Sequence, residues 1–115
     1  SGLRAARLYR VKTDVIENLA RAELSVEDLA VRHGISPRYI RSLFDEDHTT
    51  FSDFLREQRL RRARRLLSDP ASADYSIGRI AHDRGFSSVS YFNQAFRRRY
   101  GMTPSDVRAA AKSAS

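Results

Sequence analysis

The fold is decided by residues 76–107, which read SIGRIAHDRGFSSVSYFNQAFRRRYGMTPSDV. Ser76 is a good N-cap for a short helix, and Gly85 is a residue type that commonly follows a helix end. Ser87–Ser88 opens a second helix, and the Thr-Pro pair at 103–104 opens a third. Apolar residues recur at helical spacing along the first two helices, at Ile77, Ile80, Ala81, Tyr91, Phe92, Ala95 and Phe96. The stretch therefore predicts two helices joined by a tight turn, followed by a short last helix.

A copy of this pattern lies earlier in the chain. Ser25–Ala30 matches Ser76–Ala81 at an offset of 51 residues, and Gly34–Ser36 matches Gly85–Ser87 at the same offset. Two later matches have offsets of 52 and 53, and they pair Ile40 and Phe44 with Phe92 and Phe96, and Phe51–Phe54 with Pro104–Val107. Each of two turns has gained one residue. The self-similarity predicts two tandem helix-turn-helix units, in each of which the second helix is shaped to enter a DNA major groove.

The whole chain is predicted to be all-α, as one seven-helix domain over residues 1–115. Its expected parts are a first helix at Leu3–Leu24, a second at Val26–His33, a third opening at Ser36-Pro37, a fourth at 50–68, a linker at 69–74 and a last helix ending near Ala111. The expected lobes are about 10–50 and 75–111, joined by the helix at 50–68. That helix would be roughly 28 Å long, close to the spacing of about 34 Å between successive major grooves. One monomer could then read two adjacent groove segments.

Charge and composition indicate a polyanionic partner. The chain has 115 residues, a formal net charge of +7 and 21 basic side chains, of which only Lys12 and Lys112 are lysines. A balance this basic favours nucleic acid or an anionic membrane surface. Arginine suits phosphates and guanine edges well, although coding bias toward arginine explains its dominance equally well.

Several functional classes find no support in the sequence. There is no cysteine, so disulfides and thiolate metal sites are excluded, and no apolar run is long enough to span a bilayer. The three histidines lack metal-ligand spacing, and no nucleophile pattern or glycine-rich phosphate loop occurs. We therefore expect no enzymatic activity, catalytic residue, metal or cofactor, no membrane partner and a cytoplasmic location.

The chain resembles the DNA-binding domain of the AraC/XylS transcriptional regulators. The match covers about residues 10–110 and is carried by Leu29-Ala30 with Gly34–Phe44, by Arg59-Leu60 with Ala63–Leu67, and by Ile80-Ala81 with Gly85-Phe86, Tyr91-Phe92, Phe96-Arg97, Tyr100-Gly101 and Thr103-Pro104. The resemblance implies two lobes on a long middle helix, sequence-specific binding of double-stranded DNA and contact with RNA polymerase at promoters. It also implies that an effector-sensing or dimerisation domain often precedes this module, and none is expected within these 115 residues.

Two recognition helices follow from the pattern and the resemblance, at 37–46 and 88–100. The apolar residues of each helix must face the core, and the outward positions then fall on the family's base-contacting positions. These are Arg38, Arg41 and Ser42 in the first unit, and Val89, Ser90, Asn93 and Gln94 in the second. Arginine suits guanine, asparagine and glutamine suit adenine, and valine can touch a thymine methyl group. Phosphate contact or plain solvation remains the alternative for the two arginines.

Phosphate contacts are expected where helix N-termini and basic side chains meet the backbone. The candidates are Ser36, Ser87, Ser88, Arg97 and Arg98, and Arg99 is a further candidate in the same run. The arginine run at 59–65 is spread around a helix, so most of it is expected to form a solvated face. The ring of Tyr91 is expected to be partly buried in the core, and phosphate contact is the alternative for it.

One departure from the family pattern lies in the loop after the first recognition helix, where many members have glycine and this chain has Asp47-His48-Thr49. Acidic residues cluster at this end of the helix, at Asp45, Glu46 and Asp47. Carboxylates repel phosphate, so this end is expected to point away from the DNA backbone. The alternative function is a basic helical adaptor that binds an acidic protein partner. It would explain the charge but not the repeated units.

Overall fold

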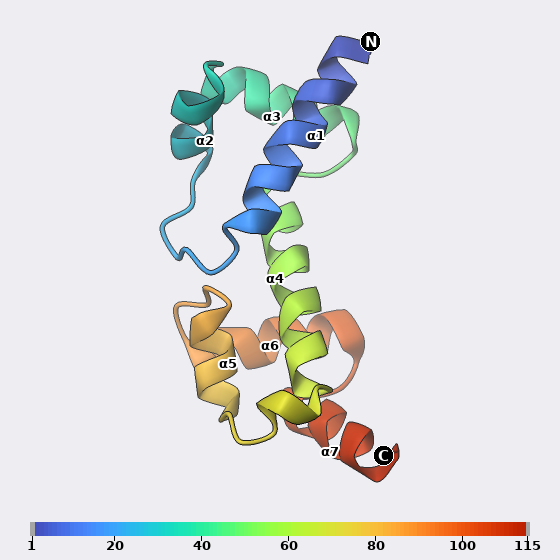
Figure 1. Ribbon diagram of the computed structural model, residues 1–115. Coiled ribbons are helices and arrows are strands. Elements are labelled where there is room, and N and C mark those ends of the chain that lie inside the picture. The colour runs from blue at the N-terminus through green and yellow to red at the C-terminus, as the bar shows by residue number, and fades with distance from the viewer. Residues whose placement is uncertain (1, 115) are drawn as a thin grey trace. The chain divides into compact units, whose positions relative to one another are not determined.

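The computed structural model describes residues 2–114, which form seven α-helices, one 3₁₀ helix and no strand (Figure 1). The elements are α1 (Gly2–Glu17), α2 (Val26–His33), α3 (Pro37–Glu46), α4 (Phe51–Leu67), η1 (Pro70–Ser72), α5 (Ile77–Asp83), α6 (Val89–Tyr100) and α7 (Pro104–Ala114). The predicted all-α class is confirmed. Contacts divide the chain into two compact units, unit 1 (Ser1–Gln58) and unit 2 (Arg59–Ser115). No helix among residues 2–114 combines the length and the apolar character needed to cross a membrane.

Unit 1 is built around the apolar faces of its helices. Val11 and Val15 of α1 are buried beside Leu29 of α2 and Ile40 and Phe44 of α3. These residues recur every three or four positions, which places them on one side of each helix. The helix-turn-helix pair α2–α3 therefore packs against α1 through a continuous core.

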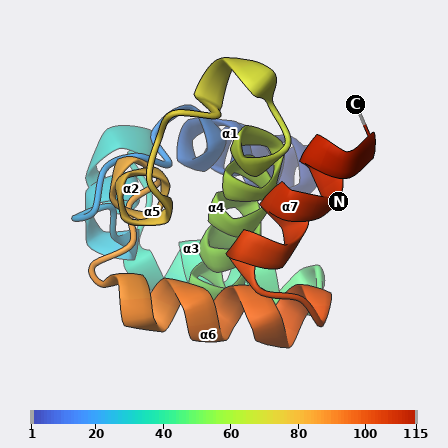
Figure 2. The same ribbon diagram turned by 90° about the horizontal axis from the view of Figure 1, so that it is seen from below.

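Unit 2 has an aromatic core. The rings of Phe86 and Phe92 lie 4.9 Å apart, those of Phe92 and Phe96 5.6 Å apart, and those of Phe96 and Tyr100 4.8 Å apart. Phe92 and Phe96 are completely buried. Figure 2 shows α6 from the side and α5 end-on, so the two helices of this helix-turn-helix cross steeply. The predicted core residue Ala95 is only partly buried, at the edge of this cluster.

Serine caps set the helix starts in both units. Ser25, Ser36, Ser76 and Ser88 each accept a hydrogen bond from the backbone N–H three residues later, as an N-cap does. Gly34 follows α2 with φ +66° and donates its N–H to Val31, so it forms the left-handed end that glycine favours. The cap at Ser88, rather than Ser87, makes α6 begin at Val89.

The predicted length of the first helix is wrong. The helix ends at Glu17 rather than at Leu24, although Leu19 and Leu24 are buried as the periodicity required. The amide of Asn18 donates to the carbonyl of Asp14 at 2.9 Å, and the backbone then continues in tight turns. A side chain that satisfies a terminal carbonyl ends the helix, while the apolar pattern continues through the turns. At the other terminus, α7 runs further than predicted, to Ala114.

Candidate nucleic-acid interface

The outward face of α3 carries two arginines. Ile40, Leu43 and Phe44 are completely buried, which leaves Arg38 and Arg41 exposed on the opposite side. Within residues 2–114 the structure records no hydrogen bond or ion pair for the side chain of Arg38. Its guanidinium group therefore presents all five donors to an incoming ligand.

Arg41 has a competing partner. Its Nη2 lies 3.3 Å from Oε2 of Glu27, and the two side chains are 59% and 67% exposed. Exposed pairs of this kind stabilise by about 0–1 kcal/mol, because solvent screens them. Arg41 can therefore exchange the Glu27 carboxylate for another acceptor at small cost.

Ser42 lies on the side of α3 that faces α1. It is half-buried and accepts a hydrogen bond from Nη2 of Arg4, whose Nε also pairs with Glu46 at 2.5 Å. The ring of Tyr39 lies under the guanidinium groups of Arg4 and Arg7, at 5.0 Å and 5.4 Å. This contact with α1 leaves Ser42 less available than the two arginines.

The acidic end of α3 is partly neutralised by α1. Glu46 pairs with Arg4, and Asp47 accepts a hydrogen bond from Nζ of Lys12. The hydrogen bond from Lys12 lowers the pKa of the Asp47 carboxyl below its usual value. Two of the three carboxylates at this end therefore have basic partners within unit 1, which weakens their repulsion of a nearby phosphate.

The outward face of α6 carries uncharged polar groups followed by arginines. Ser90, Asn93 and Gln94 are exposed, and so are the later residues Arg97 and Arg98. Phe92 and Phe96 are buried on the other side of the helix. Residues three or four positions apart share a helix face, so these exposed side chains form one stripe.

Val89 and Tyr91, near the start of α6, both carry large apolar side chains that are exposed. Val89 is 42% exposed, and a Cβ added at Gly78 of α5 would lie 3.4 Å from its Cγ2, so the glycine leaves room for this valine. Tyr91 is 44% exposed, with its ring 6.0 Å from that of Phe86. The prediction that this ring is partly buried in the core is wrong, because Phe86, Phe92 and Phe96 fill the core without it.

The helix N-termini differ between the units. Ser36, Ser87 and Ser88 are all exposed, and the hydroxyls of Ser36 and Ser88 are engaged with the N–H groups of Tyr39 and Tyr91. The first residue of α3 is a proline, which has no N–H, whereas α6 begins with Val89. The N-terminus of α6 therefore offers one more backbone donor to an anion than that of α3.

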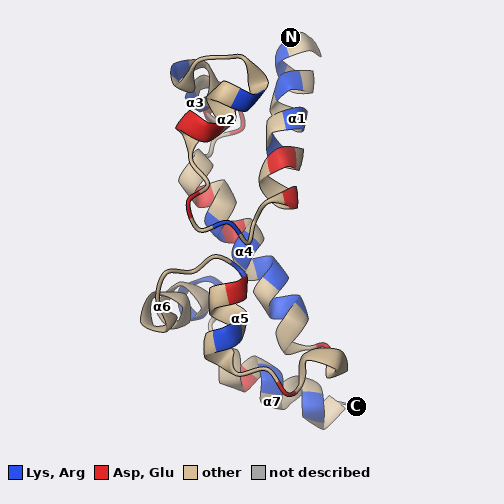
Figure 3. Ribbon diagram, turned by 60° about the vertical axis from the view of Figure 1, so that its left-hand side comes forward, with Lys and Arg blue, Asp and Glu red and all other residues tan. Residues whose placement is uncertain are grey.

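The positive charge is concentrated in unit 2. Residues 1–58 hold nine Lys/Arg and ten Asp/Glu, a formal charge of −1, whereas residues 59–115 hold twelve and four, a charge of +8, and together these give the +7 of the chain. Figure 3 shows the acidic positions mostly on unit 1. The two helix-turn-helix units are alike in sequence pattern but opposite in the sign of their charge.

The arginine run on α4 is not uniformly solvated. Arg61, Arg64 and Arg65 are exposed, but Arg59 is only 9% exposed and Arg62 is half-buried. Sequence reasoning missed the burial of Arg59. Its position one residue before Leu60 and four before Ala63, both core residues, is the signal that could have revealed it.

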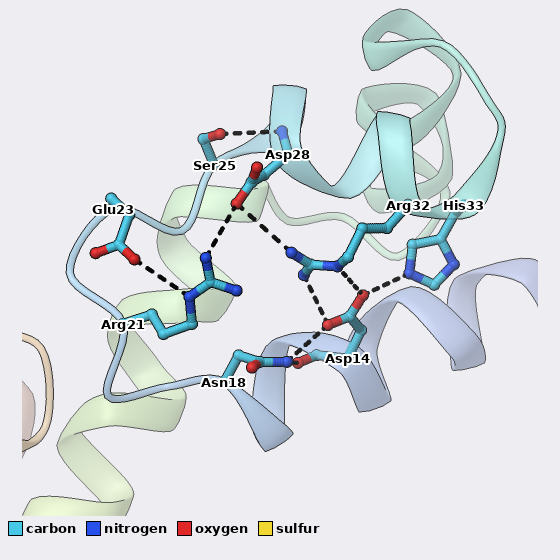
Figure 4. Close-up of polar contacts among 8 residues, drawn as sticks. All are labelled: Asp14, Asn18, Arg21, Glu23, Ser25, Asp28, Arg32 and His33. Carbon is cyan, nitrogen blue, oxygen red and sulfur yellow. Dashed lines mark hydrogen bonds and ion pairs between the residues drawn. The ribbon is translucent and has the colours of Figure 1, made fainter.

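A polar network ties α1 to the end of α2, and the sequence did not indicate it (Figure 4). Oδ1 of Asp14 accepts a hydrogen bond from Nη2 of Arg32 at 2.8 Å, and its Oδ2 lies 2.7 Å from Nε2 of His33. Arg32 also pairs with Asp28, which in turn lies 3.9 Å from Arg21. Burial alone would raise the pKa of Asp14, but hydrogen bonds from Arg32 and His33 outweigh it and lower the pKa.

Within residues 2–114 no three His, Cys, Asp or Glu side chains are grouped as metal ligands.

Replacing Asp14 with asparagine is expected to destabilise unit 1 by about 1–3 kcal/mol at neutral pH, because a partly buried acceptor of charged donors is lost. The pKa of Asp14 is lowered in the folded protein, so its carboxylate contributes its full stabilisation above the unfolded-state pKa of about 3.9. This stabilisation is lost as the pH falls through the lower pKa of the folded state. Urea unfolding at pH 7 and pH 3 measures the free energy of unfolding of the variant and of the original protein. The control is Asp83→Asn, which breaks an exposed pair with Arg79. A loss that is no larger than the control's would contradict the role of Asp14.

Comparison with known proteins places the geometry in a family. Residues 29–110 match a family model described as a helix-turn-helix domain. The transcriptional activator RhrA of Rhizobium meliloti is 41% identical over 108 residues, covering 94% of this chain and 34% of that protein. The chain thus spans about a third of the length of this curated relative.

Two solved structures have the same fold. A transcriptional regulator from Chromobacterium violaceum, described as AraC-type, superposes with a TM-score of 0.84 and 31% identity, with 96% of each chain covered. The DNA-binding domain of AdpA, solved in complex with a target DNA, superposes with a TM-score of 0.79 and 32% identity over 92% of this chain and 93% of that one. By its family match, its relatives and its fold, the chain belongs to the AraC/XylS family of helix-turn-helix transcription regulators.

Proposed function

We propose that this chain binds double-stranded DNA sequence-specifically in transcription regulation, with α3 and α6 in successive major grooves. The observation that carries the proposal is the repeated presentation of an outward polar face on the second helix of each unit, opposite a fully buried apolar face. The similar AdpA domain was solved bound to its target DNA, which supports the same use here.

Each unit has its own reading residues. Arg38 and Arg41 would contact guanine edges, and Ser42 would join them once Arg4 releases its hydroxyl. On α6 the reading set is Val89, Ser90, Asn93 and Gln94. Phosphate contacts are assigned to Ser36, Ser87, Ser88, Arg97 and Arg98. Lobes of about 10–50 and 75–111, joined by the helix at 50–68, would act on one duplex.

The charge difference suggests a division of labour. Phosphate neutralisation supplies most non-specific DNA affinity, and unit 2 holds the +8 that this requires. Unit 1 has a charge of −1, so its two outward arginines contribute mainly where a base edge matches them. We infer that unit 2 supplies affinity and unit 1 supplies much of the discrimination.

The wider setting is also part of the proposal. The activity is regulatory and not enzymatic, it takes place in the cytoplasm on the nucleoid, and RNA polymerase is the protein partner. Because the chain spans about a third of the relative RhrA, an effector-sensing or dimerisation domain is proposed to act beside it in a longer protein.

The charge of unit 2 also favours a second candidate, an adaptor that binds an acidic protein. A binding selection on random-sequence DNA at two salt concentrations separates the two functions. An enriched motif of two elements about one helical turn apart would support bipartite reading. Salt-sensitive binding without a motif would reduce the function to non-specific polyanion binding. No binding at low salt would overturn DNA binding and favour the adaptor.

Replacing Glu27 with glutamine is expected to tighten binding to the selected DNA sequence by up to about fivefold, because Arg41 no longer has to leave a carboxylate. Fluorescence anisotropy with a labelled duplex measures the change. The matched control is Glu17→Gln, which removes the same charge from the end of α1. An equal gain in both variants would show that net charge, rather than release of Arg41, is responsible.

A further inference from the structure

A cleft in unit 2 gathers four arginines where α4 meets the end of α6. It is an open cleft of about 470 Å³, lined by Arg61, Arg64, Arg65, Ser68, Arg99 and Tyr100. No acidic residue contributes to this lining. The cleft lies apart from the stripe of Ser90, Asn93 and Gln94, so the reading face does not account for it.

The ring of Tyr100 organises the cleft. The guanidinium groups of Arg64 and Arg99 lie 4.5 Å and 4.8 Å from its centroid, within the range of cation–π attraction. The ring is itself fixed against the buried Phe96, at 4.8 Å. Two of the four arginines therefore lie against a ring that is itself packed on the core.

The chemistry of the lining selects an oxyanion. Guanidinium groups present planar pairs of N–H donors that match phosphate oxygens, and Ser68 adds a hydroxyl. The guanidinium groups occupy the space beside the Tyr100 ring, so the ring is not available to stack a base. Sites for small organic ligands are enclosed and mostly apolar, whereas this cleft is open and four of its six lining residues are arginines. A chain of phosphates fits it better than a compact ligand.

We propose that this cleft binds phosphate groups of the DNA backbone and is a second contact of unit 2, separate from the base-reading face of α6. The assignment of the phosphate to DNA rests on the proposed DNA-binding function. Arg97 and Arg98 precede Arg99 in the last turn of α6, so basic side chains continue from the reading face toward the cleft. The cleft would add sequence-independent affinity to the contacts made by the reading helix.

The test follows three backbone amide signals of the 115-residue chain by NMR. Ser68 and Tyr100 report on the cleft, and Ser90 reports on the reading face. A random-sequence duplex is expected to shift all three signals, and inorganic tripolyphosphate is expected to shift the two cleft signals. A duplex that shifts Ser90 alone would overturn the cleft proposal and leave DNA binding intact. No shift at any of the three with duplex would contradict DNA binding itself.

Variants separate the cleft from net charge. Arg64→Gln with Arg65→Gln is expected to weaken random-duplex binding about tenfold. The slope of the logarithm of the binding constant against the logarithm of salt concentration should fall in magnitude by about 1.8, the value for two lost phosphate contacts. The charge-preserving Arg64→Lys with Arg65→Lys should lose part of the affinity, because lysine lacks the planar fork. Arg97→Gln with Arg98→Gln should leave the tripolyphosphate shifts of Ser68 and Tyr100 in place. Equal binding by the lysine variant and the original protein would overturn a built site.

Two other results would overturn the proposed ligand. A cleft that responds to tripolyphosphate but not to duplex DNA would be a site for a free phosphorylated compound. A stronger response to poly-L-glutamate than to DNA would indicate an acidic protein partner.

Discussion

Replacing Phe96 with alanine is expected to unfold unit 2. The side chain is completely buried, with its ring between those of Phe92 at 5.6 Å and Tyr100 at 4.8 Å. Truncating a buried phenylalanine costs about 3–5 kcal/mol, and a unit of this size holds few kcal/mol in reserve. The ring contacts run from Phe86 to Tyr100, so removing Phe96 breaks the chain of rings near its end.

Circular dichroism and amide hydrogen exchange measure the outcome. The melting transition of unit 2 should fall by at least about 12 °C, and its amides should lose protection while the buried amides of unit 1 remain slow to exchange. Tyr91→Ala is the control, because it removes a ring that is 44% exposed and should change the melting temperature little. An unchanged melting curve for the Phe96 variant would refute the central place of this residue in the core.

The fold could be predicted from the sequence because its signals are local. The serine caps, the glycine after α2 and the apolar spacing of α3 and α6 each depend on residues only a few positions apart. The end of α1 was not predictable in this way. Leu19 and Leu24 keep the helical spacing, yet the chain leaves the helix at Asn18, whose side chain bonds the carbonyl of Asp14.

The candidate interface was predictable in its exposure but not in its partners. The outward position of Arg38 and Arg41 follows from the buried face of α3 alone. The contacts of Arg4 with Ser42 and of Arg41 with Glu27 depend on how α1 and α2 pack against α3. Long exposed side chains have several partners of similar energy, so sequence distance does not identify the one that is used.

The arginine cleft was also not predictable from the sequence, because it depends on contacts between distant parts of the chain. Its lining comes from the end of α4 with Ser68 and from the last turn of α6, about 35 residues apart, and the ring of Tyr100 contacts one arginine from each helix. The arginine run on α4 was visible in the sequence, but a helix spreads such a run around its axis. The packing of Tyr100 brings Arg64 and Arg99 to the same ring.

Replacing Arg38 with alanine is expected to lower the preference for the selected DNA sequence over random DNA by about 1–3 kcal/mol, roughly 5- to 150-fold. The expectation follows from its exposed guanidinium, for which residues 2–114 provide no recorded hydrogen bond or ion pair. Nothing has to be broken before this side chain binds a guanine edge. Arg41→Ala should cost less, because in the free protein Arg41 gives up its pair with Glu27 before it binds.

Anisotropy titrations on the selected site, on single base-pair variants of it and on random duplexes measure both effects. Loss of Arg38 should remove discrimination at one base pair and leave the other positions unchanged. Arg10→Ala is the matched control, since it removes one exposed arginine from α1 of the same unit. Equal losses on selected and random DNA would make Arg38 a phosphate contact, and the discrimination of unit 1 would then have to come from Arg41 and Ser42. Because unit 1 has a formal charge of −1, its sequence-independent affinity for DNA should be small. Such affinity is largest at low salt, so titrations at low salt separate a phosphate contact of Arg38 from a base contact.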